Sequence, residues 1–238
     1  MRIKSDYWLL NKPVAHRGLW GGDVRENSVT AYEKAAEKGY PIEIDVYTSS
    51  DGKLMSFHDK TLKRMTGEEG FIFDRSYEQL RKLRLAGSND YIPSLNEVFE
   101  IACGKVPLLI EIKNQPDKTV TDRVINELKK YKGEFAVQSF NPFYIKRVKQ
   151  TAPDFIRGIL ATEEAEGENF ITSYVVKNMP FNRIIKPDFI SYHHTALPLK
   201  KHKVKDIPVI AWTITGKEEE AKARLQAKNI IFEGYIPD

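Results

Sequence analysis

The sequence predicts an α/β fold in which eight parallel strands close into a (β/α)8 barrel. Short apolar runs alternate with amphipathic helical patterns along nearly the whole chain. This alternation is typical of a parallel sheet whose strands are joined by helices. Eight such runs fall within 238 residues, close to the ~250 residues of an eight-stranded barrel. An open doubly wound sheet is the alternative, but the chain contains no GxGxxG or P-loop sequence.

The order of the expected strands and helices follows directly from these runs. The strands are expected at 14–16, 42–48, 108–112, 135–140, 155–161, 189–193, 209–214 and 230–232. Helical patterns are clear at 28–38, 95–103, 120–131, 142–151 and 217–227, and weaker at 170–177 and 197–201. Asn27 or Ser28 can cap the first helix, Gly39 is placed to end it, and Ser94 begins a capping-box pattern.

One segment, 49–93, interrupts the alternation. It contains a turn sequence at 50–52, the pair His58-Asp59 and a short helical pattern near 77–83. We therefore expect a single domain, 1–238, in which 49–93 is a small inserted subdomain after the second strand, on the face where the strands end. The apolar run 71–73 would form either the core of this subdomain or an apolar approach to the site.

Composition excludes several classes of protein. The net charge of +4 is too small to indicate nucleic-acid binding; it suits an anionic substrate, although surface lysines explain it equally well. The single cysteine, Cys103, excludes an internal disulfide, and its helical context predicts a buried small apolar side chain. No apolar run approaches the ~18 residues of a membrane span. The run at 7–10 is too short for a signal peptide, so we expect a cytoplasmic protein.

Three carboxylates lie on two expected strands. Glu43 and Asp45 are at positions i and i+2, so their side chains share one face of their strand. Glu111 lies on the strand at 108–112. Burying like charges is costly unless a cation lies between them, and carboxylate oxygens suit a hard divalent cation. An exposed edge strand is the alternative, but its flanks are too apolar, and we predict a divalent-metal site.

Other polar side chains follow the ends of the expected strands. They are His16, Arg17, Lys113, Gln138 and Trp212, together with His58-Asp59 in the insertion. In a parallel barrel these ends converge on one mouth. Arginine and lysine suit a phosphate group, and two histidines suit general acid and base catalysis. Taken singly, each residue has a structural alternative, such as a core histidine or an ion-paired surface strand. Together they predict metal-assisted phosphoester cleavage.

An ordered series of short motifs resembles the glycerophosphodiester phosphodiesterase family. The series is His16-Arg17-Gly18, Glu26-Asn27, Glu43-Ile44-Asp45-Val46, His58-Asp59 with Thr61-Leu62, Ile92-Pro93-Ser94-Leu95, Glu111-Ile112-Lys113, Gln138-Ser139-Phe140 and Trp212-Thr213. It runs over nearly the whole chain, and its N-terminal half is the specific part. The resemblance implies a TIM barrel with a small inserted subdomain. It also implies hydrolysis of a glycerophosphodiester to an alcohol and sn-glycerol 3-phosphate.

The resemblance also implies a role for each motif in this sequence. Glu43, Asp45 and Glu111 would bind Mg²⁺ or Ca²⁺, and His16 and His58 would be the acid/base pair, in an order left open. Arg17 and Lys113 would hold the phosphate, and Trp212 would line the glycerol pocket. The supporting residues would be Glu26, Asn27, Asp59 and Gln138, with helix capping as the alternative for Asn27.

Two other functions fit the same residues. One is a lysophospholipase D-like phosphodiesterase, whose leaving group carries an acyl chain. The other is a non-catalytic barrel that binds phosphodiesters. In each case the expected partner is a small phosphodiester, with no nucleic acid and no membrane span, and the oligomeric state is not predicted.

Overall fold

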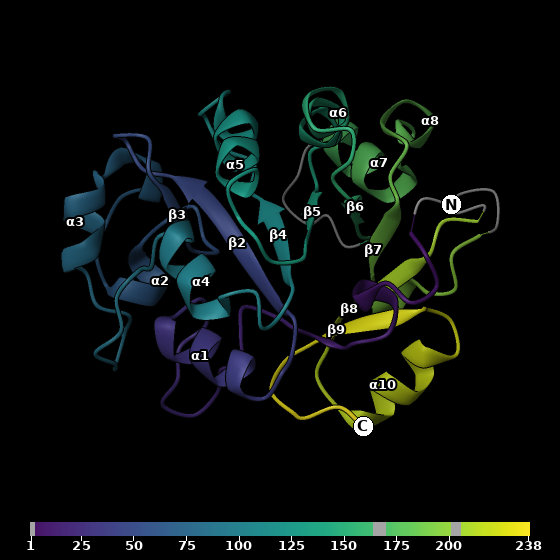
Figure 1. The fold of residues 1–238 in the computed structure, drawn as a ribbon, viewed down its shortest axis with the longest axis horizontal. Helices are drawn as coiled ribbons and strands as arrows, with labels where there is room; N and C mark the ends of the chain where they lie inside the picture. Colours follow the sequence, from purple (N-terminus) through teal and green to yellow (C-terminus); the bar gives the residue numbers. More distant parts are fainter. Residues whose placement is uncertain (1–2, 164–169, 201–205) are drawn as a thin grey trace. The chain divides into compact units, whose positions relative to one another are not determined.

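A computed structural model describes residues 3–163, 170–200 and 206–238. They group into two compact units. We call Ala15–Phe135 the N-terminal unit, and Met1–Val14 with Ala136–Asp238 the C-terminal unit. Figure 1 labels most of the helices and strands of each unit.

The N-terminal unit is built around β2 (Ile42–Thr48), which lies between β3 (Leu54–Ser56) and β4 (Leu108–Ile112) (Figure 1). β4 is parallel to β2 and β3 is antiparallel to it. β1 (Val14–Ala15) pairs in parallel with the start of β2. All residues of β2 and β4 are buried. Burial on both faces is typical of parallel strands covered by helices, and it explains the nearly continuous apolar runs.

The helices of this unit are α1 (Val29–Glu37), α2 (Lys63–Thr66), η2 (Ile72–Asp74), α3 (Tyr77–Lys82), α4 (Leu95–Ala102) and α5 (Val120–Leu128). Four of them, α1, α3, α4 and α5, match the expected helical patterns, whereas α2 and η2 were not expected. Ser28 caps α1, since its side chain accepts a hydrogen bond from the Ala31 amide. Gly39 follows the helix with a positive φ of 75°, the left-handed conformation that glycine adopts at helix ends.

The segment 49–93 has an apolar core of its own. Its buried members include Leu62, Ile72 and Leu80, and the half-buried Phe73 packs against them. The side chain of Phe71 is 43% exposed, and its ring stacks on Phe73 with centroids 5.1 Å apart. Ile72 and Phe73, two of the three residues of the apolar run 71–73, therefore belong to a small core, which is one of the two alternatives expected for this run. The division into one domain, 1–238, with an insertion at 49–93 stays a prediction.

The capping box at Ser94 allows a test of local stability. Ser94 Oγ accepts a hydrogen bond from the Glu97 amide at 3.3 Å, and Glu97 Oε2 accepts one from the Ser94 amide at 2.9 Å. We expect Ser94→Ala to lower the free energy of unfolding by about 1 kcal/mol, because the first turn of α4 loses a hydrogen-bond acceptor. Urea denaturation measures this change. Ser94→Thr is the control, because its hydroxyl keeps both the acceptor and the donor that Ser94 Oγ offers to Glu97, and an unchanged midpoint in Ser94→Ala would contradict the expectation.

The C-terminal unit contains a parallel sheet in chain order. Its strands are β5 (Phe135–Ser139), β6 (Arg157–Ala161), β7 (Phe189–His193), β8 (Val209–Ile214) and β9 (Asn229–Phe232) (Figure 1). The other elements are η1 (Trp8–Leu10), α6 (Pro142–Thr151), α7 (Phe170–Asn178), α8 (Asn182–Ile185), η3 (His194–Ala196) and α10 (Lys217–Arg224). The Asn229 side chain, at the start of β9, donates a hydrogen bond to the Leu9 carbonyl at 2.9 Å. This bond ties η1 to the sheet.

Two expectations from the sequence are wrong. The helix expected at 197–201 is not formed over 197–200, and residue 201 lies outside the described residues. Leu197 is extended, with φ −82° and ψ 148°, because a residue before proline is disfavoured from the helical region. Cys103 is exposed rather than buried. It ends α4 with a φ of 45°, which turns the chain away from the apolar side of the helix.

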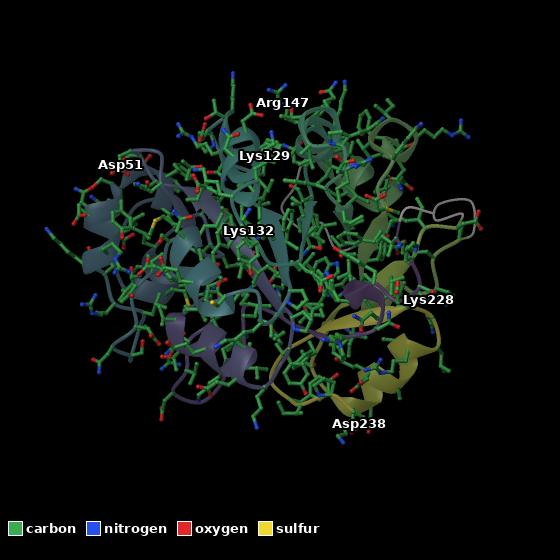
Figure 2. The ribbon with its side chains drawn as sticks, in the orientation of Figure 1. Asp51, Lys129, Lys132, Arg147, Lys228 and Asp238 are labelled. Atoms are coloured by element: carbon green, nitrogen blue, oxygen red, sulfur yellow. The ribbon has the colours of Figure 1, made fainter. Side chains whose placement is uncertain are left out.

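Charged side chains lie on the outside of both units. Figure 2 labels six exposed examples: Asp51, Lys129, Lys132, Arg147, Lys228 and Asp238. Within the described ranges, no helix combines the length and apolarity needed to cross a membrane.

Candidate active site

Three buried carboxylates form the centre of the candidate site. Asp45 on β2 lies directly opposite Glu111 on β4 in the parallel register, and Glu43 lies on the same face of β2 as Asp45. One carboxylate oxygen from each residue lies within 4.8 Å of the other two. The i, i+2 spacing and the strand pairing therefore produce the cluster that the sequence predicts.

Two cations contact these carboxylates. Lys113 Nζ lies 2.9 Å from Glu111 Oε1 and 3.2 Å from Asp45 Oδ1. The Arg17 amide donates a hydrogen bond to Glu43 Oε2 at 3.0 Å, and its guanidinium Nε lies 3.4 Å from Asp45 Oδ2. The φ of Arg17 is 58°, a left-handed conformation that is uncommon outside glycine. It places both the amide and the side chain against the carboxylates.

Burial and charge separate the pKa values of the two β2 carboxylates. Burial, together with the negative charges of Asp45 and Glu111, raises the pKa of Glu43 well above its ordinary value. Burial acts on Asp45 in the same direction, but the positive charges of Lys113, His58 and Arg17 lower the pKa of Asp45 overall. Burial would lower the pKa of Lys113, yet Asp45 and Glu111 raise it. The pKa values of the two β2 carboxylates are thus shifted in opposite directions, upward for Glu43 and downward for Asp45.

A buried hydrogen-bond network orients Asp45. Asn27 Nδ2 donates to Asp45 Oδ2 at 2.9 Å, and Asn27 Oδ1 accepts from the Tyr32 hydroxyl at 2.7 Å. Tyr32 also hydrogen-bonds to Ser56, and burial raises its pKa well above the ordinary range, which keeps the phenol as a donor. Ser28 rather than Asn27 caps α1, and Asn27 contacts Asp45; its supporting part in the site stays a prediction. Tyr32 and Ser56 are not among the residues predicted for the site, because both fit an ordinary apolar helix or strand face.

The two candidate histidines lie near the carboxylates. His16 follows β1, and its Nε2 lies 4.0 Å from Glu43 Oε2. His58 follows β3, and its Nδ1 lies 2.8 Å from Asp59 Oδ1. Their side chains are 15% and 32% exposed, so both can reach solvent or a small ligand.

An ion-pair network joins Asp59 to Arg17. Arg64 lies between Asp59 and Glu26, with closest distances of 2.6 Å to each carboxylate. Glu26 in turn lies 2.9 Å from Arg17 Nη1. Burial opposes ionisation of Glu26, but the Arg64 hydrogen bond and the Arg17 charge lower its pKa. Arg64 is not among the residues predicted for the site. Its one signal in the sequence is its place shortly after His58-Asp59, where Lys63-Arg64 is typical of ordinary surface charge.

The other two predicted site residues lie in the C-terminal unit. Gln138 on β5 is buried, and its Oε1 accepts a hydrogen bond from Ser191 at 2.8 Å. Trp212 on β8 is half-buried and packs edge-on against Phe140 and His193, with ring centroids 5.7 and 5.0 Å apart. Their parts in the site stay predictions.

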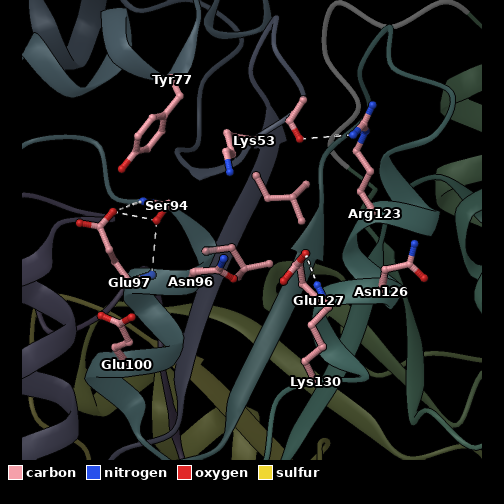
Figure 3. A pocket seen from close by; sticks show the side chains of 13 residues that line it. Lys53, Tyr77, Ser94, Asn96, Glu97, Glu100, Arg123, Asn126, Glu127 and Lys130 are labelled. Atoms are coloured by element: carbon pink, nitrogen blue, oxygen red, sulfur yellow. Dashed lines mark hydrogen bonds and ion pairs between the residues drawn. The ribbon is translucent and has the colours of Figure 1, made fainter.

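A groove of about 550 Å³ in the N-terminal unit lies among other residues (Figure 3). Its walls come from the turn after β2, from α4 and from α5. Charged groups along it pair with each other, as Glu127 does with Lys130 at 2.9 Å. None of the candidate site residues lines this groove.

The class of protein follows from the fold and the site. Parallel strands are joined by helices, and a carboxylate cluster and two histidines lie on or just after strands. The chain is an α/β protein with a buried, charged site on its strands. Comparison with known proteins narrows this class to one family.

The model of the "Glycerophosphoryl diester phosphodiesterase family" matches residues 16–231, and the chain belongs to this family. A "Glycerophosphodiester phosphodiesterase" from Caldanaerobacter subterraneus subsp. tengcongensis is 33% identical over 226 residues, which cover 87% of this chain and 86% of the relative. The protein is therefore a phosphoric diester hydrolase, as the resemblance implies.

Solved structures confirm the expected TIM-barrel fold. A phosphodiesterase from Oleispira antarctica, described in complex with its product sn-glycerol-3-phosphate, matches with a TM-score of 0.78 at 23% identity. The match covers 93% of this chain and 92% of that one. A glycerophosphodiester phosphodiesterase from Thermotoga maritima matches with a TM-score of 0.72 at 27% identity, over 93% of this chain and 94% of that one.

Proposed function

We propose that this enzyme hydrolyses glycerophosphodiesters to an alcohol and sn-glycerol 3-phosphate, with a divalent cation and a pair of histidines. The observation that carries the proposal is the buried cluster of Glu43, Asp45 and Glu111, whose ligand atoms lie within 4.8 Å of one another. The substrate class is supported by the curated relative and by the product bound to the Oleispira antarctica enzyme.

The donor set of the cluster fits Mg²⁺ or Ca²⁺. All its candidate ligands are carboxylate oxygens, which hard cations prefer, and all three residues are buried. Lys113 and Arg17 supply two positive charges against the three carboxylates, so the cluster has one negative charge in excess once Glu43 is ionised. When bound, the cation would stabilise negative charge on the phosphoryl oxygens.

His16 and His58 would move the protons of the reaction. Hydrolysis breaks one P–O bond: one histidine accepts the proton of the attacking nucleophile, and the other donates a proton to the leaving alkoxide. Hydrogen bonds from His58 and Arg64 outweigh the effect of burial and lower the pKa of Asp59. The ionised carboxylate can only accept, so His58 Nδ1 carries a proton and Nε2 is left for the substrate.

The remaining residues would bind and position the substrate. Arg17 and Lys113 would hold the phosphate, and Glu26, Asn27, Asp59 and Gln138 would support the groups that contact it. Trp212 would line the glycerol pocket. Its indole nitrogen is buried without a hydrogen-bond partner in the part of the chain that the structure describes, which suits donation to a glycerol hydroxyl.

The leaving group is proposed to be a small polar alcohol rather than an acyl-bearing one. A lysophospholipase D-like activity needs an apolar approach to the site, and the run 71–73 was the candidate for it. Ile72 is fully buried and Phe73 packs against the same core, so only Phe71 is substantially exposed.

Release of glycerol 3-phosphate tests the proposed function. We expect release from glycerophosphocholine or glycerophosphoethanolamine, loss of release in EDTA, and recovery on addition of Mg²⁺ or Ca²⁺. Lysophosphatidylcholine is the comparison substrate for the acyl-bearing alternative. Binding of a glycerophosphodiester by the folded, metal-loaded protein without any release would contradict the proposal.

A further inference from the structure

We propose that Arg64 is a positioning residue that holds His58 in its working orientation through Asp59. This inference rests on the proposed function of His58 as a general acid or base. It adds to that function a residue in the insertion that touches neither the carboxylate cluster nor the substrate.

The contact between Arg64 and Asp59 uses both oxygens of the carboxylate. Arg64 Nε donates to Asp59 Oδ2 at 2.6 Å, and Nη2 donates to Oδ1 at 2.9 Å. Two parallel hydrogen bonds between a planar guanidinium and a carboxylate fix the plane of the carboxylate as well as its position. Asp59 therefore has little freedom to rotate while Arg64 is in place.

A second carboxylate anchors the opposite side of the same guanidinium. Arg64 Nη2 donates to Glu26 Oε1 at 2.6 Å, and Nη1 donates to Oε2 at 3.2 Å. Glu26 is only 6% exposed and is itself held by Arg17 at 2.9 Å. The Arg64 side chain is 49% exposed, and an isolated surface ion pair of that exposure contributes little to stability. Arg64 differs from such a pair because it lies between two carboxylates, one of them buried, and is fixed from both sides.

The contact with His58 completes the chain of interactions. Asp59 Oδ1, the oxygen that accepts from Arg64 Nη2, also contacts His58 Nδ1 at 2.8 Å. A carboxylate that accepts from the distal nitrogen of a functional imidazole sets both the tautomer and the orientation of the ring. Loss of Arg64 would let Asp59 rotate, and the direction of His58 Nε2 would no longer be defined.

Arginine is required at this position for a geometric reason. A lysine ammonium is a point charge and cannot donate two parallel hydrogen bonds to each of two carboxylates. A lysine at this position would therefore keep a positive charge between Glu26 and Asp59, but it would not fix the orientation of the Asp59 carboxylate.

Steady-state kinetics of Arg64→Gln test the inference. We expect kcat to fall about tenfold to a hundredfold, the usual range for a residue that orients a functional group, with KM changed less than about threefold. Arg64→Lys should recover only a minor part of kcat. Lys63→Gln is the matched control, because Lys63 lies beside Arg64 on α2 and pairs with Glu69 at 2.6 Å. An equal fall in the control would overturn the proposal.

A double-mutant cycle with Asp59 separates positioning from a structural role. If Arg64 acts through Asp59, then Arg64→Gln should change kcat less than about twofold in an Asp59→Asn background. The same factor in both backgrounds would contradict the proposed route through Asp59.

The state of the His58 ring gives a readout that needs no substrate. The chain has five histidines, and comparison with His58→Gln assigns the ¹⁵N signals of His58. We expect wild type and Lys63→Gln to share the Nδ1-protonated signature, and Arg64→Gln to lose it. Unchanged His58 signals in Arg64→Gln would refute the proposal, even if the wild type failed to hydrolyse glycerophosphodiesters, so the two failures are distinguishable.

Discussion

Alanine at either His16 or His58 is expected to lower kcat by about a thousandfold, within the 10²–10⁴-fold range of general acid or base catalysis. Both side chains lie beside the carboxylate cluster or its supporting ion pairs and are partly exposed. Their removal leaves no large cavity in the core, so both variants should fold. Circular dichroism checks the fold, and release of glycerol 3-phosphate under saturating substrate measures kcat. Lys60→Ala is the control, because Lys60 is exposed and lies directly after Asp59.

The same variants distinguish the acid from the base. A phosphodiester with a nitrophenolate leaving group needs no proton on the departing oxygen. The variant that lacks the general acid should therefore recover most of its activity on such a substrate, whereas the variant that lacks the base should not. A rate close to wild type in either variant on glycerophosphocholine would remove that histidine from the proposed pair.

Glu43→Gln is expected to weaken the affinity for Mg²⁺ or Ca²⁺ at least tenfold. The substitution keeps the shape of the side chain but removes the charge of one of three clustered oxygen donors, and cation affinity depends strongly on ligand charge. Isothermal titration calorimetry on the metal-free protein measures the affinity. Glu127→Gln removes the same charge from a residue that pairs with Lys130 on the surface and serves as control. Equal affinities in the wild type and Glu43→Gln would place the cation site elsewhere.

The pKa of Glu43 also predicts how cation binding depends on pH. Burial and the neighbouring carboxylates raise this pKa well above its ordinary value of 4.5, whereas a cation binds the ionised form. Binding must therefore release a proton, and affinity should rise as the pH increases from about 4.5 toward the raised pKa. Titrations in buffers of different ionisation enthalpy measure the released protons. The wild type should release more than Glu43→Gln, and equal release in both would contradict the assignment.

The elements that carry the site were predictable, because their patterns are local. The strand 42–48 is an apolar run buried over its whole length, and the period of two alone puts Glu43 and Asp45 on one face. The capping box at Ser94 is likewise a matter of spacing. The failures have local causes too. Pro198 disfavours a helical Leu197, and Cys103 lies beyond the last turn of α4, where helical periodicity no longer describes the side chain.

The network around His58 was not predictable from spacing. Arg64 binds Asp59 in its own segment but also Glu26, which lies before β2 in the sequence. Asn27 has two roles open to it in the sequence, and its contact with Asp45 is visible only in the fold. Glu26 lies 38 residues from Arg64, and Asp45 lies 18 residues from Asn27, so spacing along the chain does not reveal either contact.

The sequence by itself determined the positions of the eight expected strands but not that of β3, and it determined the family and the identity of the carboxylates, histidines and cations proposed for the reaction. Period-two and helical patterns, and short motifs in a fixed order, are local properties of the chain, and each can be read without knowing what the chain packs against. Only the tertiary structure decided which carboxylate each cation contacts, which β2 carboxylate has its pKa raised, and that Arg64 is held between Asp59 and Glu26. Those outcomes depend on burial and on distances of a few ångströms between segments, which sequence spacing does not specify.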